Sequence, residues 1–117
     1  MKLKATLIGA VIGCSIASSA SAACSTSDVR VKSWNWHVEH GYAIYVGEIV
    51  NGCAEATGVQ LQIVSRSASG EAVDSEQFWP ASTNNIPAGG SYVFKWTAEA
   101  NRQAKNATLG VIAVNQW

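Results

Sequence analysis

Apolar and polar residues alternate with a period of two along much of the chain, most clearly in its middle. Val59–Val64 reads Val-Gln-Leu-Gln-Ile-Val, while Tyr42–Asn51 is rich in β-branched and aromatic residues and ends on the turn signal Asn51-Gly52. Successive side chains on a strand point to opposite faces, so this alternation is typical of half-buried strands. The pattern predicts two strands, joined by a loop that carries Cys53.

The preceding segment, Val29–Val38, predicts a strand with one aromatic face, because Trp34 and Trp36 share one parity while Val29, Val31 and Asn35 fall on the other. The break before the next strand is short, and His40-Gly41 is suited to a tight hairpin turn. Such a turn would place Trp36 opposite Tyr45 and Trp34 opposite Gly47. A large ring lying over a strand glycine covers its bare backbone.

We expect the face of Trp34 and Trp36 to point inward, together with Tyr45 and Ile49. A row of two indoles and a phenol exposed on a sheet would exceed the apolar patch that most monomers tolerate. The opposite face would bury polar groups such as Asn35 without partners. An inward Trp36 predicts that its replacement by alanine costs roughly 3–5 kcal/mol of stability.

Three later segments complete the predicted strands: Glu71–Phe78 as an edge strand with a weaker pattern, then Ser91–Thr97 and Leu109–Val114. Ala98–Lys105 lacks β-branched residues and contains three alanines, so it can form one or two helical turns. About six or seven short strands, with no helical segment long enough for a βαβ unit, favour an antiparallel arrangement. We expect an all-β fold, a small antiparallel β-sandwich.

The first 22 residues have the three parts of a secretory signal peptide: early lysines, an uncharged apolar run and a string of small residues. Ala20-Ser21-Ala22 supplies small residues at both recognition positions before a cut, so we assign 1–22 to the signal and 23–117 to a single domain. The apolar run is shorter than the about 20 residues that span a bilayer, so we expect no transmembrane segment in the mature chain. Lipidation of Cys14 is the alternative, since Val11-Ile12-Gly13-Cys14 is similar to the lipobox of bacterial lipoproteins.

Both alternatives export the protein: cleavage predicts a periplasmic or secreted bacterial protein, and lipidation predicts an outer-membrane lipoprotein with a lipid anchor at Cys14. Removal of Lys2 and Lys4 leaves six basic and eight acidic residues, a net charge of −2. No basic stripe is available for phosphates, so neither nucleic acid nor an anionic membrane is an expected partner.

Two cysteines remain after cleavage, Cys24 and Cys53. An oxidising compartment favours a disulfide between them, and a buried free thiol at Cys53 is the alternative. Closing a loop of about 30 residues would contribute roughly 3–4 kcal/mol in the chain-entropy model. The bond would pin the start of the domain to the sheet.

A further set of strand and turn residues spans Trp34 to Trp96. Its members are Trp36, Val46–Asn51, Gly58–Val64, the turn glycine Gly70 and Ile86–Phe94. Together they resemble the FxLYD domain of exported bacterial and archaeal proteins, although Leu61–Ser65 stands in the region of the name-giving motif without its Tyr-Asp pair. The resemblance implies an immunoglobulin-like β-sandwich that serves as a module of cell-envelope proteins.

The chain shows no catalytic constellation. His37 and His40 are the two histidines, and residues three apart on a strand point to opposite faces, so we expect no shared metal. The serines occur without a G-x-S-x-G elbow, and Glu39 and Glu48 do not face each other in the predicted hairpin. A domain of roughly 95 residues also has little volume for a deep pocket. We therefore predict no enzyme, no metal and no cofactor.

The five tryptophans are the remaining candidates for recognition. They can fill the core or, in an exported domain, stack on sugar rings. Trp79 precedes Pro80 in a loop and is the best candidate for an exposed ligand contact. We expect a non-catalytic interaction domain of the cell envelope that binds a protein partner through a sheet edge or a loop. A small carbohydrate-binding module that uses surface tryptophans is the alternative.

Overall fold

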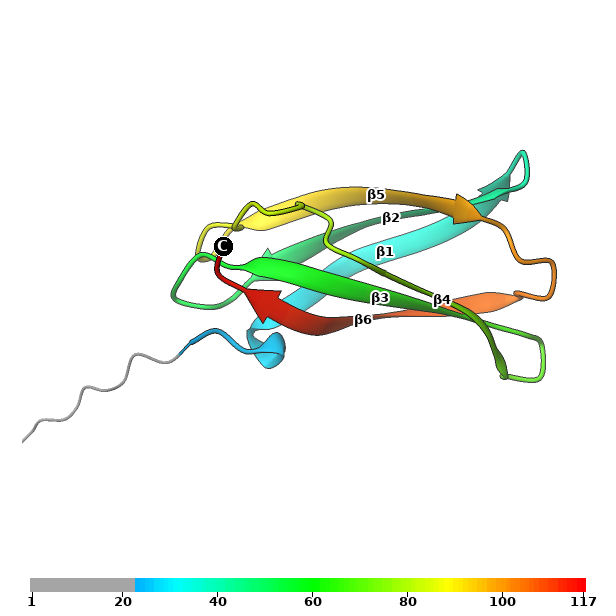
Figure 1. The fold of residues 1–117 in the computed structure, drawn as a ribbon, viewed down its shortest axis with the longest axis horizontal. Helices are drawn as coiled ribbons and strands as arrows, with labels where there is room; N and C mark the ends of the chain where they lie inside the picture. The colour runs from blue at the N-terminus through cyan, green and yellow to red at the C-terminus, as the bar shows by residue number, and fades with distance from the viewer. Residues whose placement is uncertain (1–22) are drawn as a thin grey trace, which may run out of the picture.

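The computed structural model describes residues 23–117, which form two packed β-sheets preceded by a short 3-10 helix (Figure 1). The predicted signal peptide and Cys14 lie outside the described residues. The helix is η2 (Thr26–Asp28), and the strands are β1 (Val29–Glu39), β2 (Tyr42–Asn51), β3 (Gly58–Arg66), β4 (Ala72–Phe78), β5 (Ser91–Glu99) and β6 (Asn106–Asn115).

Each sheet has three antiparallel strands, in the orders β1-β2-β5 and β4-β3-β6. The expected all-β fold is confirmed: residues 23–117 form a small antiparallel β-sandwich of six strands. β4 lies at the edge of its sheet, as its weak alternation predicts. β2 and β3 are the central strands of the two sheets. The loop that joins them crosses from one sheet to the other and contains Cys53.

The β1–β2 hairpin has the register that the sequence predicts. Trp36 pairs with Tyr45, and Trp34 pairs with Gly47. His40 and Gly41 form the two-residue turn, with φ angles of 53° and 83°. Positive φ at both central residues is the geometry of a type I′ turn, whose twist matches the right-handed twist of the strands.

A β-bulge between Val31 and Ser33 changes the parity of β1. Val29 and Val31 pack inward before it, and Trp34 and Trp36 pack inward after it. Strict alternation, on which the sequence prediction relied, would have put these two pairs on opposite faces. The inward direction of the two tryptophans is therefore confirmed, but the assignment of Val29 and Val31 to the other face is wrong.

The core is centred on β2 and β3, where Ile49, Leu61 and Ile63 are almost completely buried. A Cβ atom on Gly47 would lie 2.7 Å from the ring of Phe94 and 2.8 Å from the carbonyl oxygen of Ser33. The ring nearest to this glycine is therefore that of Phe94 of β5, its partner on the other side of β2.

The expected helical turns at Ala98–Lys105 are wrong. β5 continues to Glu99, and Ala98 pairs with Ala43 and packs against the core. A tight turn follows, in which the amide nitrogen of Ala104 donates to the carbonyl oxygen of Asn101 at 3.0 Å. The ladder hydrogen bonds and burial on the sheet override the weak strand propensity of alanine.

Candidate functional site

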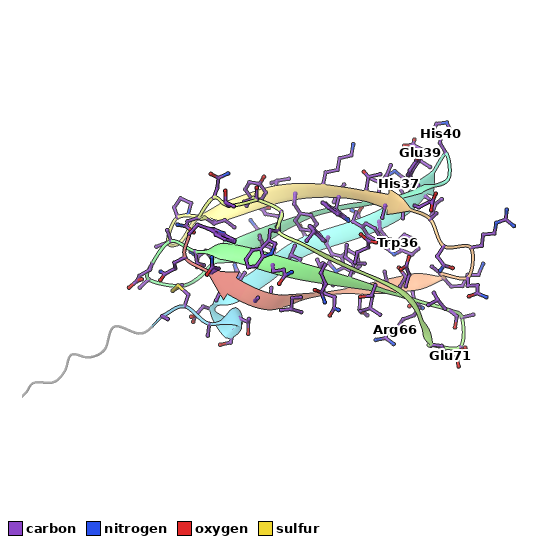
Figure 2. The ribbon with its side chains drawn as sticks, in the orientation of Figure 1. Trp36, His37, Glu39, His40, Arg66 and Glu71 are labelled. Carbon is purple, nitrogen blue, oxygen red and sulfur yellow. A yellow bond between two sulfur atoms is a disulfide. The ribbon has the colours of Figure 1, made fainter. Side chains whose placement is uncertain are left out.

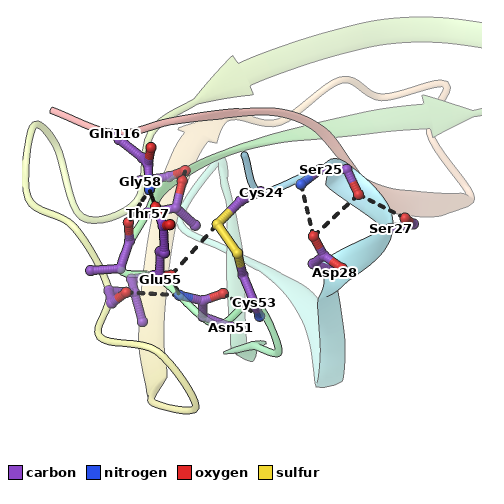
Figure 3. Close-up of a disulfide and its surroundings, with 12 residues drawn as sticks. Cys24, Ser25, Ser27, Asp28, Asn51, Cys53, Glu55, Thr57, Gly58 and Gln116 are labelled. Carbon is purple, nitrogen blue, oxygen red and sulfur yellow. Dashed lines mark hydrogen bonds between the residues drawn. A yellow bond between two sulfur atoms is a disulfide. The ribbon is translucent and has the colours of Figure 1, made fainter. Parts of the chain in front are cut away.

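Cys24 and Cys53 form the predicted disulfide, with their Cα atoms 5.7 Å apart (Figure 3). The bond links the segment before η2 to the β2–β3 loop, across a sequence separation of 29 residues. Nearby, the amide nitrogen of Gly52 donates to the carbonyl oxygen of Asp28 at 2.8 Å. The start of the domain is therefore fixed to the end of β2, and the alternative of a free thiol at Cys53 is wrong.

Asn51, the last residue of β2, is completely buried beside the disulfide (Figure 3). Its side-chain nitrogen donates to the carbonyl oxygens of Glu55 and Ile86 at 2.9 Å, and of Pro87 at 3.3 Å. Its side-chain oxygen accepts a hydrogen bond of 2.9 Å from the amide nitrogen of Cys53. All polar atoms of this amide are occupied, so it ties the β2–β3 loop to the β4–β5 loop and has none left for a ligand.

A depression of about 290 Å³ lies at the same end of the sandwich. It is lined by Ala23, Cys24, Thr57, Val114, Asn115 and Gln116. None of these side chains is an acid, a base or an available thiol, because Cys24 is part of the disulfide. The depression therefore offers no catalytic group.

Trp79 does not stand free in its loop. Its half-buried ring packs edge-on against Trp117, with ring centroids 5.3 Å apart and an interplanar angle of 72°. Trp117 is 52% exposed, and its amide nitrogen donates to the side-chain oxygen of Asn85 at 3.0 Å. Trp117 is thus the more exposed member of the pair, which sequence analysis missed because its neighbours are distant in sequence.

His37, Glu39 and His40 gather at the tip of the β1–β2 hairpin (Figure 2). The Nε2 atom of His37 lies 3.9 Å from a carboxylate oxygen of Glu39, and both side chains are more than half exposed. Within residues 23–117, no three histidine, cysteine or acidic side chains are arranged to hold a metal ion. The tip is a solvated polar cluster.

The two outer faces of the sandwich differ in polarity. The outer face of the β1-β2-β5 sheet carries an apolar surface, here named the β2 face: Tyr42, Ile44, Val46, Val50 and Val93. Val93 is 67% exposed and Tyr42 is 51% exposed, while the other three are half-buried. The outer face of the other sheet carries mainly amides and hydroxyls, namely Gln60, Gln62, Ser75, Gln77 and Thr108, with Val64 and Ile112 as its large apolar side chains.

The sequence contains a signal for this difference. Residues 42–50 are apolar on both parities apart from Gly47 and Glu48, whereas Val59–Val64 alternates with glutamine. An apolar residue at nearly every position is typical of a strand that is covered on both faces. β2 is covered by the core on one face only, which leaves its second apolar face at the surface.

Comparison of the chain with protein families, curated proteins and solved structures gives no match in any of the three. No helix within residues 23–117 is both long and apolar enough to cross a membrane. Among the surfaces of the described domain, the β2 face has the most exposed large apolar side chain, Val93, and also carries the exposed Tyr42.

Proposed function

We propose that this chain is a non-catalytic, FxLYD-like interaction domain of an exported cell-envelope protein, and that it binds a protein partner through the β2 face. The observation that carries the proposal is the exposure of Val93 and Tyr42 beside half-buried Ile44 and Val46 on one outer face. Contiguous exposed apolar surface rimmed by polar groups is typical of protein–protein contacts. The outer face of the opposite sheet is more polar, since half-buried Val64 and Ile112, 38% exposed, are its large apolar side chains.

Two features favour a protein as the ligand of the β2 face. The surface is the outer face of a sheet, and protein interfaces are commonly flat, whereas small-molecule sites are concave. Charged residues are interspersed with it: Lys95 lies across from Val46, and Glu48 lies between Val46 and Val50 and across from Val93. Apolar contacts combined with charged groups suit the recognition of a protein, because interfaces between proteins contain both.

The disulfide supports the exported location, because such bonds persist in oxidising compartments and are rare in the bacterial cytosol. Cleavage after Ala22 would release a periplasmic or secreted domain that begins one residue before Cys24. Intact mass of the protein from the exported fraction tests this step, and a diacylglyceryl adduct at Cys14 would establish the lipoprotein alternative instead.

Site-specific photo-crosslinking in the cell envelope tests the β2 face. A photo-reactive residue placed at Val93 should give a discrete crosslinked protein band, and the same residue at Gln62 on the opposite outer face should not. A second substitution, Val46→Glu, should abolish the Val93 crosslink without lowering the melting temperature by more than a few degrees. Equal crosslinking from Val93 and Gln62, or a crosslink that survives Val46→Glu, would refute the proposed surface.

The carbohydrate-binding alternative rests on a separate observation, the exposed ring of Trp117 beside the side-chain amide of Asn85. Sugar rings stack on exposed indoles and hydrogen-bond to amides, so this pair offers a minimal saccharide contact. A glycan array combined with tryptophan fluorescence tests it. Saccharide binding that is lost in Trp117→Ala and retained in Val93→Glu would favour this alternative over the protein partner.

A further inference from the structure

The four free sheet edges of the sandwich differ in how they are protected against pairing with another strand. β4 has a bulge and the half-buried Glu76, and β6 has a bulge opposite Gln60 and Leu61. β5 carries the exposed Lys95 at its centre. Bulges, inward charges and central lysines are the devices by which edge strands avoid pairing. β1 has its bulge and Lys32 in its first half only, so the segment 33–39 is an unprotected edge.

The positions of the free backbone groups on this edge follow from the ladder. The carbonyl oxygen of Gly41 accepts a hydrogen bond from the amide nitrogen of Ala100, so odd-numbered β2 residues point to β5 and even-numbered ones to β1. The β1 partners of the even-numbered residues include Asn35 and His37. The alternate residues of β1 therefore turn their N–H and C=O groups to the open edge: Trp34, Trp36 and Val38.

The side chains at these positions are also incompletely covered. Trp34 and Trp36 pack on the core but stay half-buried, and Val38 is 56% exposed. On the opposite side of the sandwich, by contrast, Phe78 stacks on Trp96 with ring centroids 4.5 Å apart. β1 and β6 lie near each other beside η2 and separate toward the hairpin tip (Figure 1), and Trp36, labelled in Figure 2, lies on this second half of β1.

The charges along β1 identify which strand fits this edge. Lys32 lies near its beginning and Glu39 at its end, both on the outer face and both exposed. An antiparallel copy of the same strand centred on Trp36 would place Glu39 of one chain opposite Ser33 of the other, one position from the bulge residue Lys32, at both ends of the contact. Opposite charges across a strand pair are favourable, and a parallel copy would set like charges side by side.

We infer that β1 pairs in antiparallel fashion with β1 of a second copy of this chain, about a two-fold axis at Trp36. The free groups fit this register, since Trp36 then opposes Trp36 and Trp34 opposes Val38 as hydrogen-bonded pairs. Three such pairs give about six main-chain hydrogen bonds. The two β1-β2-β5 sheets become one continuous sheet of six strands. The contact uses a sheet edge, so it stands independently of a partner bound on the β2 face.

The self-pairing also explains why the tryptophans are only half-buried in one copy. In the paired sheet, the Trp36 side chains of the two copies lie next to each other on the core-facing side. The Trp34 side chain of each copy lies next to Val38 of the other. Aromatic and β-branched cross-strand pairs are among the more stabilising ones in antiparallel sheets. The isologous contact is closed, so it yields a dimer and not a fibre.

Sedimentation velocity of the protein, expressed from its first codon and purified from the exported fraction, tests the inference. The dimer fraction should rise with concentration between about 1 μM and 1 mM, the range of weak to moderate interfaces. Val38→Pro removes one edge N–H per chain while leaving every bond of the β1–β2 ladder intact. Loss of two hydrogen bonds per dimer should raise the dissociation constant roughly 30-fold.

Thr97→Pro is the matched control, because Thr97 is exposed and turns its N–H to the free edge of β5 on the other side of the same sheet. It should leave the dissociation constant unchanged. A chain that stays monomeric throughout the concentration range would overturn the inference. So would a dimer that is weakened equally by the two proline substitutions, since that would place the contact elsewhere.

A charge exchange tests the register. Lys32→Glu and Glu39→Lys should each raise the dissociation constant about 3- to 10-fold, because each sets like charges across the dimer. The double substitution should restore the parent value. Lys32 also lies 4.0 Å from Glu48 of its own chain, so Lys32→Gln is the control that removes both attractions of the lysine without adding a like charge, and it should weaken the dimer less than Lys32→Glu. A double variant as weak as the singles would overturn the antiparallel pairing.

Discussion

The two ends of the sandwich are held together in different ways. At the disulfide end, the β2–β3 and β4–β5 loops cross between the sheets and are joined by Cys24–Cys53 and by the amide of Asn51 (Figure 3). At the hairpin end, the β1–β2 and β3–β4 connections are short turns closed by neighbouring residues, such as His40-Gly41 and Ser67–Gly70 (Figure 1).

Both ends have long-range contacts, since Asn101 at the hairpin end donates to the carbonyl oxygen of Val73 at 3.2 Å, but within residues 23–117 those at the disulfide end include a covalent bond and a completely buried amide. The hydrogen bond from Asn51 to Ile86 joins residues 35 apart, and the disulfide joins residues 29 apart. The bond from Gly70 to Ser67 in the β3–β4 turn joins neighbours. Long-range contacts oppose the larger loss of chain entropy. We therefore expect substitutions at the disulfide end to cost the most stability.

Asn51→Ala should have the largest effect, about 3–5 kcal/mol of unfolding free energy, because it leaves three carbonyl oxygens and one amide N–H without their buried partner. Asn51→Asp should be at least as costly, since a carboxylate keeps the acceptor but removes the donors and buries a charge. Urea denaturation of the oxidised proteins measures both. Asn35→Ala on the exposed side of β1 is the control and should change the free energy by less than about 0.5 kcal/mol. An Asn51→Ala variant within about 1 kcal/mol of the parent would show that the amide does not hold this end together.

The hairpin end could be predicted from the sequence, and the disulfide end could be predicted only in part. The pairings of Trp36 with Tyr45 and Trp34 with Gly47 followed from one short turn and strand alternation. At the other end, two cysteines in an exported chain indicated their bond, because few other pairings existed. Asn51 gave only a turn signal, since its hydrogen bonds to Ile86 and Pro87 depend on how two distant loops meet.

The candidate site was less predictable than the fold. Trp79 was correctly placed in a loop, but its packing on Trp117 could not be seen, because it depends on where the chain end lies. The β2 face was missed because only the inward residues of this strand, such as Tyr45 and Ile49, were considered, and the apolar residues of the other parity were not. The bulge at Val31–Ser33 was missed because no glycine or proline marks it, and it moved Val29 and Val31 to the inner side.

Removal of the disulfide should cost roughly 3–4 kcal/mol, from the entropy of the released loop of about 30 residues. The variant is Cys24→Ser combined with Cys53→Ser, compared with the parent in urea at low protein concentration. Reduction of the parent should lower its stability by a similar amount. In the unreduced parent, neither cysteine should react with an alkylating reagent under denaturing conditions; alkylation of both would contradict the bond.

Trp36→Ala should lower the free energy of unfolding by about 2–3 kcal/mol, because the side chain is half-buried and the substitution removes one stacking contact. This cost is at or below the lower end of the range that the sequence predicts for a fully buried ring. That contact is with Tyr45, whose ring centroid lies 6.0 Å away. Trp36→Phe keeps an aromatic ring on the core and should cost about 1 kcal/mol. Chemical denaturation well below the dimer dissociation constant measures the single copy. A Trp36→Ala variant as stable as the parent would mean that the ring serves recognition only.

The turn of the β1–β2 hairpin should give the smallest effects, with opposite signs at its two residues. Gly41 has a φ of 83°, and a Cβ atom added to it would meet nothing within 4 Å. Gly41→Ala therefore adds backbone strain without a clash, and it should lower the stability of the domain by about 1 kcal/mol. His40 has a φ of 53°, and asparagine tolerates this conformation better than histidine at the first position of a type I′ turn. His40→Asn should therefore stabilise the domain by about 0.5 kcal/mol. Melting curves of each variant beside the parent measure both changes. A Gly41→Ala variant as stable as the parent would show that the positive φ of this turn does not contribute to the stability of the hairpin end.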